Sequence, residues 1–213
     1  MAYVFISHSK RDETLVKRIH TLLNNIGYTA IIEEFIPPEK KQPIPYVEIT
    51  NNVRVSSFVF LFLTDNVVLT EYTKAWVMFE VSQAASLNKR LFVFERKGTP
   101  IPYPIPYLTD YMIFDETTES YLSIQWIAKE ARPRIPPNWI TAGLGTLLGL
   151  PFGPLGLVVG GLGGLILGPR DAETANIPKI NCPHCGIPFN YYSPNIRTFA
   201  CPSCRQWMTL TTS

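Results

Sequence analysis

The chain has 213 residues, 46% of them apolar, and a formal net charge of +2 at pH 7. This apolar content excludes a disordered chain, and the near-neutral charge excludes a strongly basic nucleic-acid-binding protein. The length allows one domain of ordinary size and a small appendage. The first residues lack the basic stretch and long apolar run of a secretory signal, so we expect the N-terminal domain to lie in the cytoplasm.

Short β-forming segments alternate with helical patterns over the first 131 residues. Strands are predicted over residues 2–6, 28–32, 58–63, 90–94 and 111–114. Helices are predicted over residues 15–26, 46–57, 73–87 and 121–131. The strand over 58–63 is apolar throughout, which is typical of a strand buried on both faces of a parallel sheet. We therefore predict an α/β fold with a five-stranded parallel sheet and helices on both faces.

Prolines and arginines at residues 132–137 interrupt this alternation and predict a domain boundary. Residues 140–168 then contain no charged side chain. This run exceeds the roughly 20 apolar residues that a membrane-spanning helix needs. Glycines four residues apart would allow close helix packing, as at Gly156, Gly160 and Gly164. We predict that residues 133–169 associate with a membrane as an apolar helical segment.

Three arrangements of this segment stay open. Pro151 and Pro154 divide it into two pieces, each shorter than a full span. It could form a single kinked span, a re-entrant hairpin, or a glycine-rich soluble segment that packs in an oligomer. Arginines on both sides, at 132, 134 and 170, favour the hairpin, which keeps both ends in the cytoplasm.

All four cysteines lie in two Cys-x-x-Cys pairs separated by 15 residues: Cys182, Cys185, Cys201 and Cys204. Two tight turns that each offer two sulfurs supply the tetrahedral thiolate shell that zinc prefers. We predict a zinc ribbon over residues 177–213, in which four thiolates close the shell and make the Zn²⁺ structural. The alternatives are free or disulfide-linked cysteines, or His184 in place of one ligand. Only four of the 19 Lys and Arg residues follow residue 134, which argues against nucleic acid as a partner.

Two motifs in the first part of the chain carry a family resemblance. One is the opening Phe5-Ile-Ser-His8, and the other is Trp76-x-x-x-Glu80 on a predicted helix. In this order, and with the predicted elements between them, residues 1–132 resemble the TIR domain family of prokaryotic type. The resemblance implies a flavodoxin-like fold and self-association through this domain.

The resemblance also implies a chemical role for Glu80. Many members of the family cleave NAD⁺ at the nicotinamide–ribose bond or cyclise the product, and they use a helix glutamate that matches Glu80. Bond cleavage builds positive charge on the ribose, which a carboxylate can stabilise. On the predicted helix Trp76 precedes Glu80 by one turn, so we expect a partly desolvated, partly exposed carboxylate and an indole that packs on the same ligand. The alternative is a solvated surface glutamate, with Trp76 in the core.

The resemblance assigns nucleotide contacts to two loops at the carboxyl ends of the strands, where ligands of such sheets bind. His8, Ser9 and Lys10 follow the first strand and match a loop that contacts the nucleotide. Glu33 follows the second strand and matches a position that reaches the ribose. The alternatives are a serine that caps the next helix, a solvated lysine and a solvated loop carboxylate.

Two functions follow as hypotheses. The first is a TIR protein of signalling or defence that hydrolyses or cyclises NAD⁺ at the cytoplasmic face of a membrane. The second is a non-catalytic TIR scaffold that assembles proteins at a membrane. A third hypothesis, a ribbon that senses nucleic acid, is disfavoured by the few basic residues near its cysteines.

Overall fold

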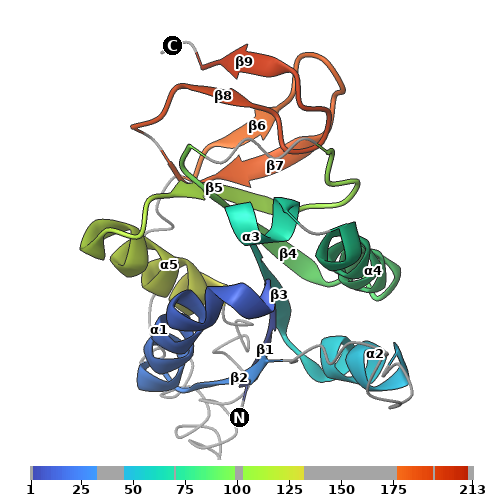
Figure 1. Ribbon diagram of the computed structural model, residues 1–213. Helices are drawn as coiled ribbons and strands as arrows, with labels where there is room; N and C mark the ends of the chain where they lie inside the picture. The colour runs from blue at the N-terminus through green and yellow to red at the C-terminus, as the bar shows by residue number, and fades with distance from the viewer. Residues whose placement is uncertain are drawn as a thin grey trace, which may run out of the picture. The chain divides into compact units, whose positions relative to one another are not determined.

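The computed structural model of the protein describes residues 2–32, 46–69, 71–98, 103–131, 177–193 and 195–210 (Figure 1). Its contacts group Met1–Ala131 with Ile177–Ser213 in one compact unit. The division into domains at 1–132, 133–169 and 177–213 stays a prediction, and the apolar segment lies outside the described residues.

A seven-stranded sheet forms the centre of this unit, in the order β2-β1-β3-β4-β5-β7-β6. Its first five strands are parallel: β1 (Ala2–Ser7), β2 (Tyr28–Ile32), β3 (Phe58–Leu63), β4 (Arg90–Arg96) and β5 (Asp110–Phe114). The predicted α/β fold with a mostly parallel sheet is thus confirmed. The sheet is wider than the five predicted strands, because β6 (Lys179–Asn181) and β7 (Pro188–Tyr191) extend it beyond β5.

Helices cover both faces of the sheet (Figure 1). They are α1 (Glu13–Asn25), α2 (Tyr46–Val55), α3 (Asp65–Val68), α4 (Glu71–Ser86) and α5 (Thr118–Glu130), with a short 3-10 turn η1 (Lys10–Asp12) before α1. The sequence pattern missed α3, which is only four residues long. It also placed the start of α5 three residues late, because Thr117 caps the helix by accepting a hydrogen bond from the Ser120 amide at 3.3 Å.

The two faces of β3 pack against different helices. Phe58, Phe60 and Phe62 point into a core with α1 and α5, whereas Val59, Leu61 and Leu63 point into a core with α2 and α4. Because side chains alternate along a strand, the apolar run FVFLFL divides into an aromatic face and an aliphatic face. Both are buried, which explains the uninterrupted apolar pattern of this strand.

The C-terminal part, which we call the four-cysteine segment (residues 177–193 and 195–210), consists of two hairpins. The first joins β6 and β7, and the second joins β8 (Thr198–Ala200) and β9 (Trp207–Thr209), which form a separate two-stranded sheet. Each hairpin turns through one Cys-x-x-Cys pair. Strands of three or four residues bury little surface, so such a segment needs further cross-links to stay folded.

Within the described ranges, no helix combines the length and the apolar character that crossing a bilayer requires. Residues 140–168, for which membrane association is predicted, lie outside those ranges.

Candidate functional site

A buried hydrogen bond joins the carboxyl end of β1 to helix α4. The hydroxyl Oγ of Ser7 donates to Oε2 of Glu80, and the two residues are only 1% and 3% exposed. Val77 and Val81, on the same helix as Glu80, are equally buried. The expectation of a partly exposed carboxylate is therefore wrong, because Ser7 receives the side chain inside the domain. A carboxylate in such surroundings interacts strongly with any nearby positive charge.

The loop after β1 places its predicted ligand residues in different surroundings. Ser9 is 3% exposed and caps η1, accepting a hydrogen bond from the Arg11 amide at 3.4 Å. Nδ1 of His8 lies 3.2 Å from the carbonyl oxygen of Ile6, so this nitrogen carries the proton and donates. Lys10 is exposed. Contacts of these residues with a nucleotide stay a prediction.

Sequence reasoning missed a second polar cluster at the same end of the sheet. Asp12 is 7% exposed and accepts hydrogen bonds from Oγ1 of Thr64 and Nδ2 of Asn66, both at 2.6 Å. These bonds tie the loop after β1 to the residues that follow β3. Sequence position could have indicated this cluster. Thr64 directly follows the most apolar strand, and Asp12 is the last residue of the polar stretch after the first strand.

Trp76 belongs to an aromatic cluster between α2 and α4. Its ring stacks on Phe79 with centroids 5.6 Å apart, and Tyr46 at the start of α2 lies 5.5 Å from Trp76 and 5.0 Å from Phe79. Tyr46 is 46% exposed, so the cluster reaches the surface. A cavity of about 350 Å³ opens beside Tyr46 and Phe79. Glu33 lies outside the described residues, and its predicted role is not tested.

The four cysteines converge as a metal site requires. Their sulfur atoms all lie within 4.8 Å of one another, with Cys182 and Cys204 3.7 Å apart and Cys185 and Cys201 4.0 Å apart. Zn–S bonds of about 2.3 Å in a tetrahedron place sulfur atoms roughly 3.8 Å apart, so the set fits zinc. All four cysteines are free, which argues against a disulfide framework.

The backbone of both turns also suits a metal. The amide of Gly186 donates to the Cys182 carbonyl at 2.9 Å, and the amide of Arg205 donates to the Cys201 carbonyl at 2.8 Å. Burial raises the pKa of the Cys182 thiol, but hydrogen bonds from the backbone amides of Cys185 and His184 outweigh burial and lower it to about 7. Amides directed at the sulfur of Cys182 favour its thiolate, which is the metal-binding form, whereas burial raises the pKa of the Cys201 thiol to about 12. His184 does not replace a cysteine as a ligand, because its Nε2 lies 3.2 Å from the carbonyl oxygen of Trp207.

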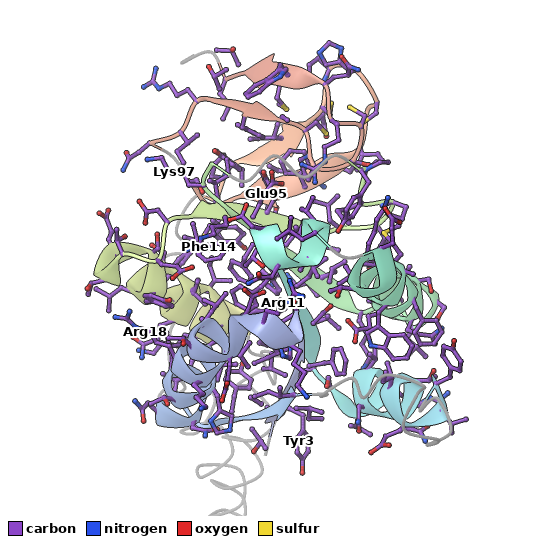
Figure 2. The ribbon with its side chains drawn as sticks, in the orientation of Figure 1. Tyr3, Arg11, Arg18, Glu95, Lys97 and Phe114 are labelled. Atoms are coloured by element: carbon purple, nitrogen blue, oxygen red, sulfur yellow. The ribbon has the colours of Figure 1, made fainter. Side chains whose placement is uncertain are left out.

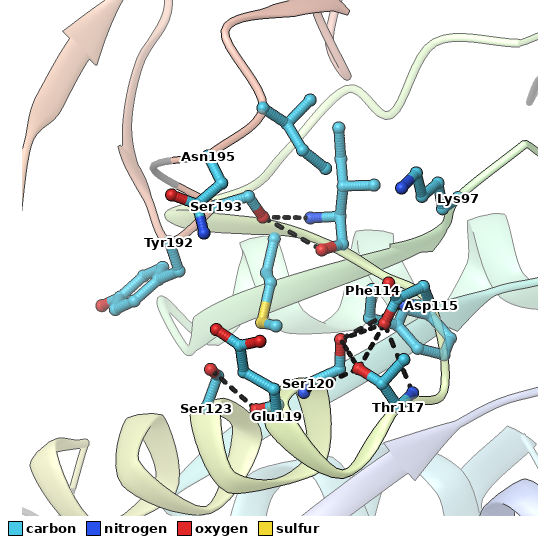
Figure 3. A pocket seen from close by; sticks show the side chains of 13 residues that line it. Lys97, Phe114, Asp115, Thr117, Glu119, Ser120, Ser123, Tyr192, Ser193 and Asn195 are labelled. Atoms are coloured by element: carbon cyan, nitrogen blue, oxygen red, sulfur yellow. Dashed lines mark hydrogen bonds between the residues drawn. The ribbon is translucent and has the colours of Figure 1, made fainter.

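Two further cavities adjoin the four-cysteine segment. One, of about 280 Å³, lies between the end of β5, the start of α5 and the loop after β7 (Figure 3). Its Asp115 accepts hydrogen bonds from the hydroxyls of Thr117 and Ser120 at 2.6 and 2.7 Å, and these bonds lower the pKa of the carboxyl group. These hydrogen bonds form the N-terminal cap of α5, so their role is to stabilise that helix. The other cavity, of about 530 Å³, has walls from β4, β5, β8 and β9.

Comparison with known protein families gives a match over the first part of the chain. The family model for the TIR domain matches residues 4–127, which is more than half of the 213 residues. The matched stretch holds Ser7, Asp12, Thr64 and Glu80, and it ends before the four-cysteine segment. A search of the curated proteins found no match. The chain belongs to the TIR domain family.

Proposed function

We propose that this protein cleaves the bond between nicotinamide and ribose in NAD⁺, with Glu80 as the catalytic carboxylate. The observation that carries the proposal is the buried Ser7–Glu80 pair at the carboxyl end of β1. The TIR domain family includes members that cleave NAD⁺, and both residues lie in the matched part of this chain. Ligands of parallel α/β sheets bind at this end of the strands, which supports a substrate site near the pair.

The reaction needs a negative group beside the ribose. When the C–N bond breaks, its electron pair leaves with nicotinamide, and positive charge develops on the sugar. A carboxylate already fixed in a site of low dielectric constant stabilises that charge without reorganising. Ser7 holds one carboxylate oxygen in place. Water then adds to the sugar and loses a proton to give ADP-ribose, or an adenine nitrogen adds and gives a cyclic product.

Other residues are proposed to hold the nucleotide. His8 and Lys10 follow β1 and would meet phosphate or adenine, and Glu33 follows β2 and would meet the ribose. Trp76 lies one helical turn before Glu80, and its ring, which stacks on Phe79 of the same helix, would pack on the ligand. Ser9 is the weakest of these candidates, because its hydroxyl caps η1.

A single substitution tests the catalytic proposal. Glu80→Gln keeps the shape of the side chain and removes its charge, so nicotinamide release should fall about 10²-fold or more. Glu71→Gln is the matched control, because Glu71 lies on the same helix with its side chain 92% exposed. The assay uses protein clustered at high concentration, since TIR domains commonly self-associate. Equal NAD⁺ loss for wild type and Glu80→Gln would end the catalytic assignment.

We also propose that the four cysteines hold one structural Zn²⁺. Four thiolates at tetrahedral spacing would leave no coordination position for a substrate, so the ion would serve folding. Zinc analysis of the purified chain should give about one ion per chain, and Cys204→Ser should lose it.

The second candidate function is a non-catalytic TIR scaffold. It is favoured by the exposed surface at the start of α2, where Tyr46 is 46% and Val47 76% exposed. These two side chains would supply apolar contacts to a protein partner. A scaffold releases no nicotinamide even when clustered, and Val47→Asp would abolish its self-association while Glu80→Gln would not.

A further inference from the structure

The four-cysteine segment completes the edge of the TIR sheet. β7 runs parallel to β5, and its neighbouring amides donate across the edge: Asn190 to the Thr109 carbonyl and Tyr192 to the Tyr111 carbonyl, both at 3.0 Å. Ser193 continues the pairing with its side chain, accepting from the Ile113 amide at 2.8 Å and donating to the Ile113 carbonyl at 3.0 Å. Without this segment, β5 would present a row of unpaired backbone groups.

One buried carboxylate of β5 accepts hydrogen bonds from both the TIR domain and the four-cysteine segment. Asp110 is fully buried. From the TIR domain, Arg90 donates two hydrogen bonds to it, at 2.7 and 2.8 Å. From the four-cysteine segment, Asn190 donates at 3.0 Å and the hydroxyl of Tyr192 at 2.8 Å. Removing the segment would take away two of the donors that stabilise a charge inside the protein.

A second carboxylate, that of Glu95 at the end of β4 (labelled in Figure 2), is bound by a residue that follows the second Cys-x-x-Cys pair. Nη1 of Arg205 lies 2.8 Å from Oε2 of Glu95, and the side chains are only 14% and 11% exposed. Arg205 follows Cys204 directly and has φ of 61°, a left-handed conformation that non-glycine residues rarely adopt. Within the described residues, Arg205 is the only cation within ion-pair distance of Glu95.

The turn of the second Cys-x-x-Cys pair also holds the segment that precedes β5. Nε of Arg205 donates to the Tyr103 carbonyl at 2.9 Å, and the Ile105 amide donates to the Pro202 carbonyl at 2.9 Å. Tyr103 in turn lies under Nζ of Lys74, on the helix that carries Glu80, at 4.8 Å from the ring centroid. The turn that holds two metal ligands is thus attached directly to the TIR domain.

The apolar cores of the two parts are continuous. The rings of Tyr191 and Phe199 stack at 4.4 Å, and Tyr111 of β5 lies 6.0 Å and 5.8 Å from them. Cys182 and Cys201 belong to the same buried cluster as the aliphatic face of β3 and β4. Loss of the metal would therefore loosen side chains that pack against the TIR sheet.

We propose that the metal at the four cysteines is a clamp on the TIR domain, which holds Arg205 against Glu95 and keeps β7 paired with β5. The proposal rests on the zinc site proposed above and is independent of NAD⁺ cleavage. The short strands of the segment need the metal to stay folded, as in other small metal-bound modules. Metal release then frees the edge of β5 and residues 103–108, while β1 and β3 keep their structure. Cys185 is exposed, so a chelator or an oxidant reaches the site from solvent.

Hydrogen exchange on the full chain tests the clamp. Zinc content is measured first, and a chain that binds no zinc would overturn both the zinc site and the clamp. With zinc bound, addition of a chelator under reducing conditions should accelerate exchange of the Ile105 and Ile113 amides by about tenfold or more, because the Pro202 carbonyl and the Ser193 hydroxyl no longer accept their hydrogen bonds. The amides of β1 and β3 should stay protected. Unchanged protection of the Ile105 and Ile113 amides, or equal loss of protection in β1 and β3, would overturn the clamp.

A variant that retains all four cysteines separates the clamp from general damage to the segment. Arg205→Gln removes the charge that faces Glu95, and we expect about tenfold faster exchange of the Ile105 amide, which donates to Pro202 in the same turn, with zinc content unchanged. Arg197→Gln is the matched control, because it makes the same change at an exposed position of the same segment. Equal exchange rates for the two variants would overturn the role of Arg205.

Discussion

Glu80 and Ser7 lie 73 positions apart in the sequence, and the fold brings them together in a buried hydrogen bond. The resemblance singled out Glu80 for its chemistry, but nothing local to the helix indicated its partner. Asp110 and Glu95 are also buried, each with donors that come from distant parts of the chain. Burial makes each of these carboxylates sensitive to the loss of a single donor.

Ser7→Ala is a prediction at this scale. The substitution removes the hydroxyl that fixes Oε2 of Glu80 and leaves the carboxylate in place. We expect the kcat of nicotinamide release to fall about tenfold, less than for Glu80→Gln, because the charge remains while its orientation loosens. Ser56→Ala is the control, since that serine is equally buried and its hydroxyl donates to the Asn52 carbonyl instead. Equal kcat values for the two serine variants would contradict a positioning role for Ser7.

At the scale of elements, the junction between β5 and β7 is rich in buried tyrosines. Burial raises the pKa of Tyr103 to about 12 and raises that of Tyr111 well above its ordinary value of 10.0. The pKa of Tyr192 is raised too, first by burial and then by the charge of Asp110. Each of these groups keeps its proton in the folded protein at a pH where the unfolded chain has lost it.

Alkaline pH should therefore weaken this junction. The folded pKa values are raised, so their stabilising contribution is complete below pH 10 and is lost as the pH rises toward about 12. We expect the urea midpoint of unfolding to fall over this range, together with the appearance of tyrosinate absorbance. Tyr111→Phe removes one titrating group and should make the fall shallower. An unchanged midpoint across the tyrosinate transition would contradict the assignment.

At the scale of the whole molecule, the residues between α5 and the four-cysteine segment carry the predicted membrane association. A chain that ends near residue 131 is a poor test of this prediction, because it would also expose the edge of β5. A better variant replaces residues 133–169 with a Gly/Ser linker and keeps both ends. The intact chain should sediment with membranes and the linker variant should not. Recovery of the intact chain in the supernatant would reject the prediction.

Periodicity and residue chemistry specified the parts of the protein that depend on local sequence. Alternating strand and helix patterns predicted a mostly parallel α/β sheet, because a strand such as FVFLFL has only buried neighbours on either face. Helix ends were less accurate, since the cap of α5 at Thr117 lies outside the apolar pattern. The spacing of the cysteines indicated a metal site, and the sulfur positions are compatible with it.

Only the tertiary structure decided which strands pair and which residues contact each buried charge. β6 and β7 have three and four residues, too few to predict their partner, and β7 finds it in β5, about 80 positions earlier at Asp110. The burial of Glu80 and the pairing of Glu95 with Arg205 depend on contacts of the same long range. Local sequence sets the type of element, because backbone preferences and periodicity act over a few residues. The partners of a buried charge are set by the sheet order, which no local pattern encodes.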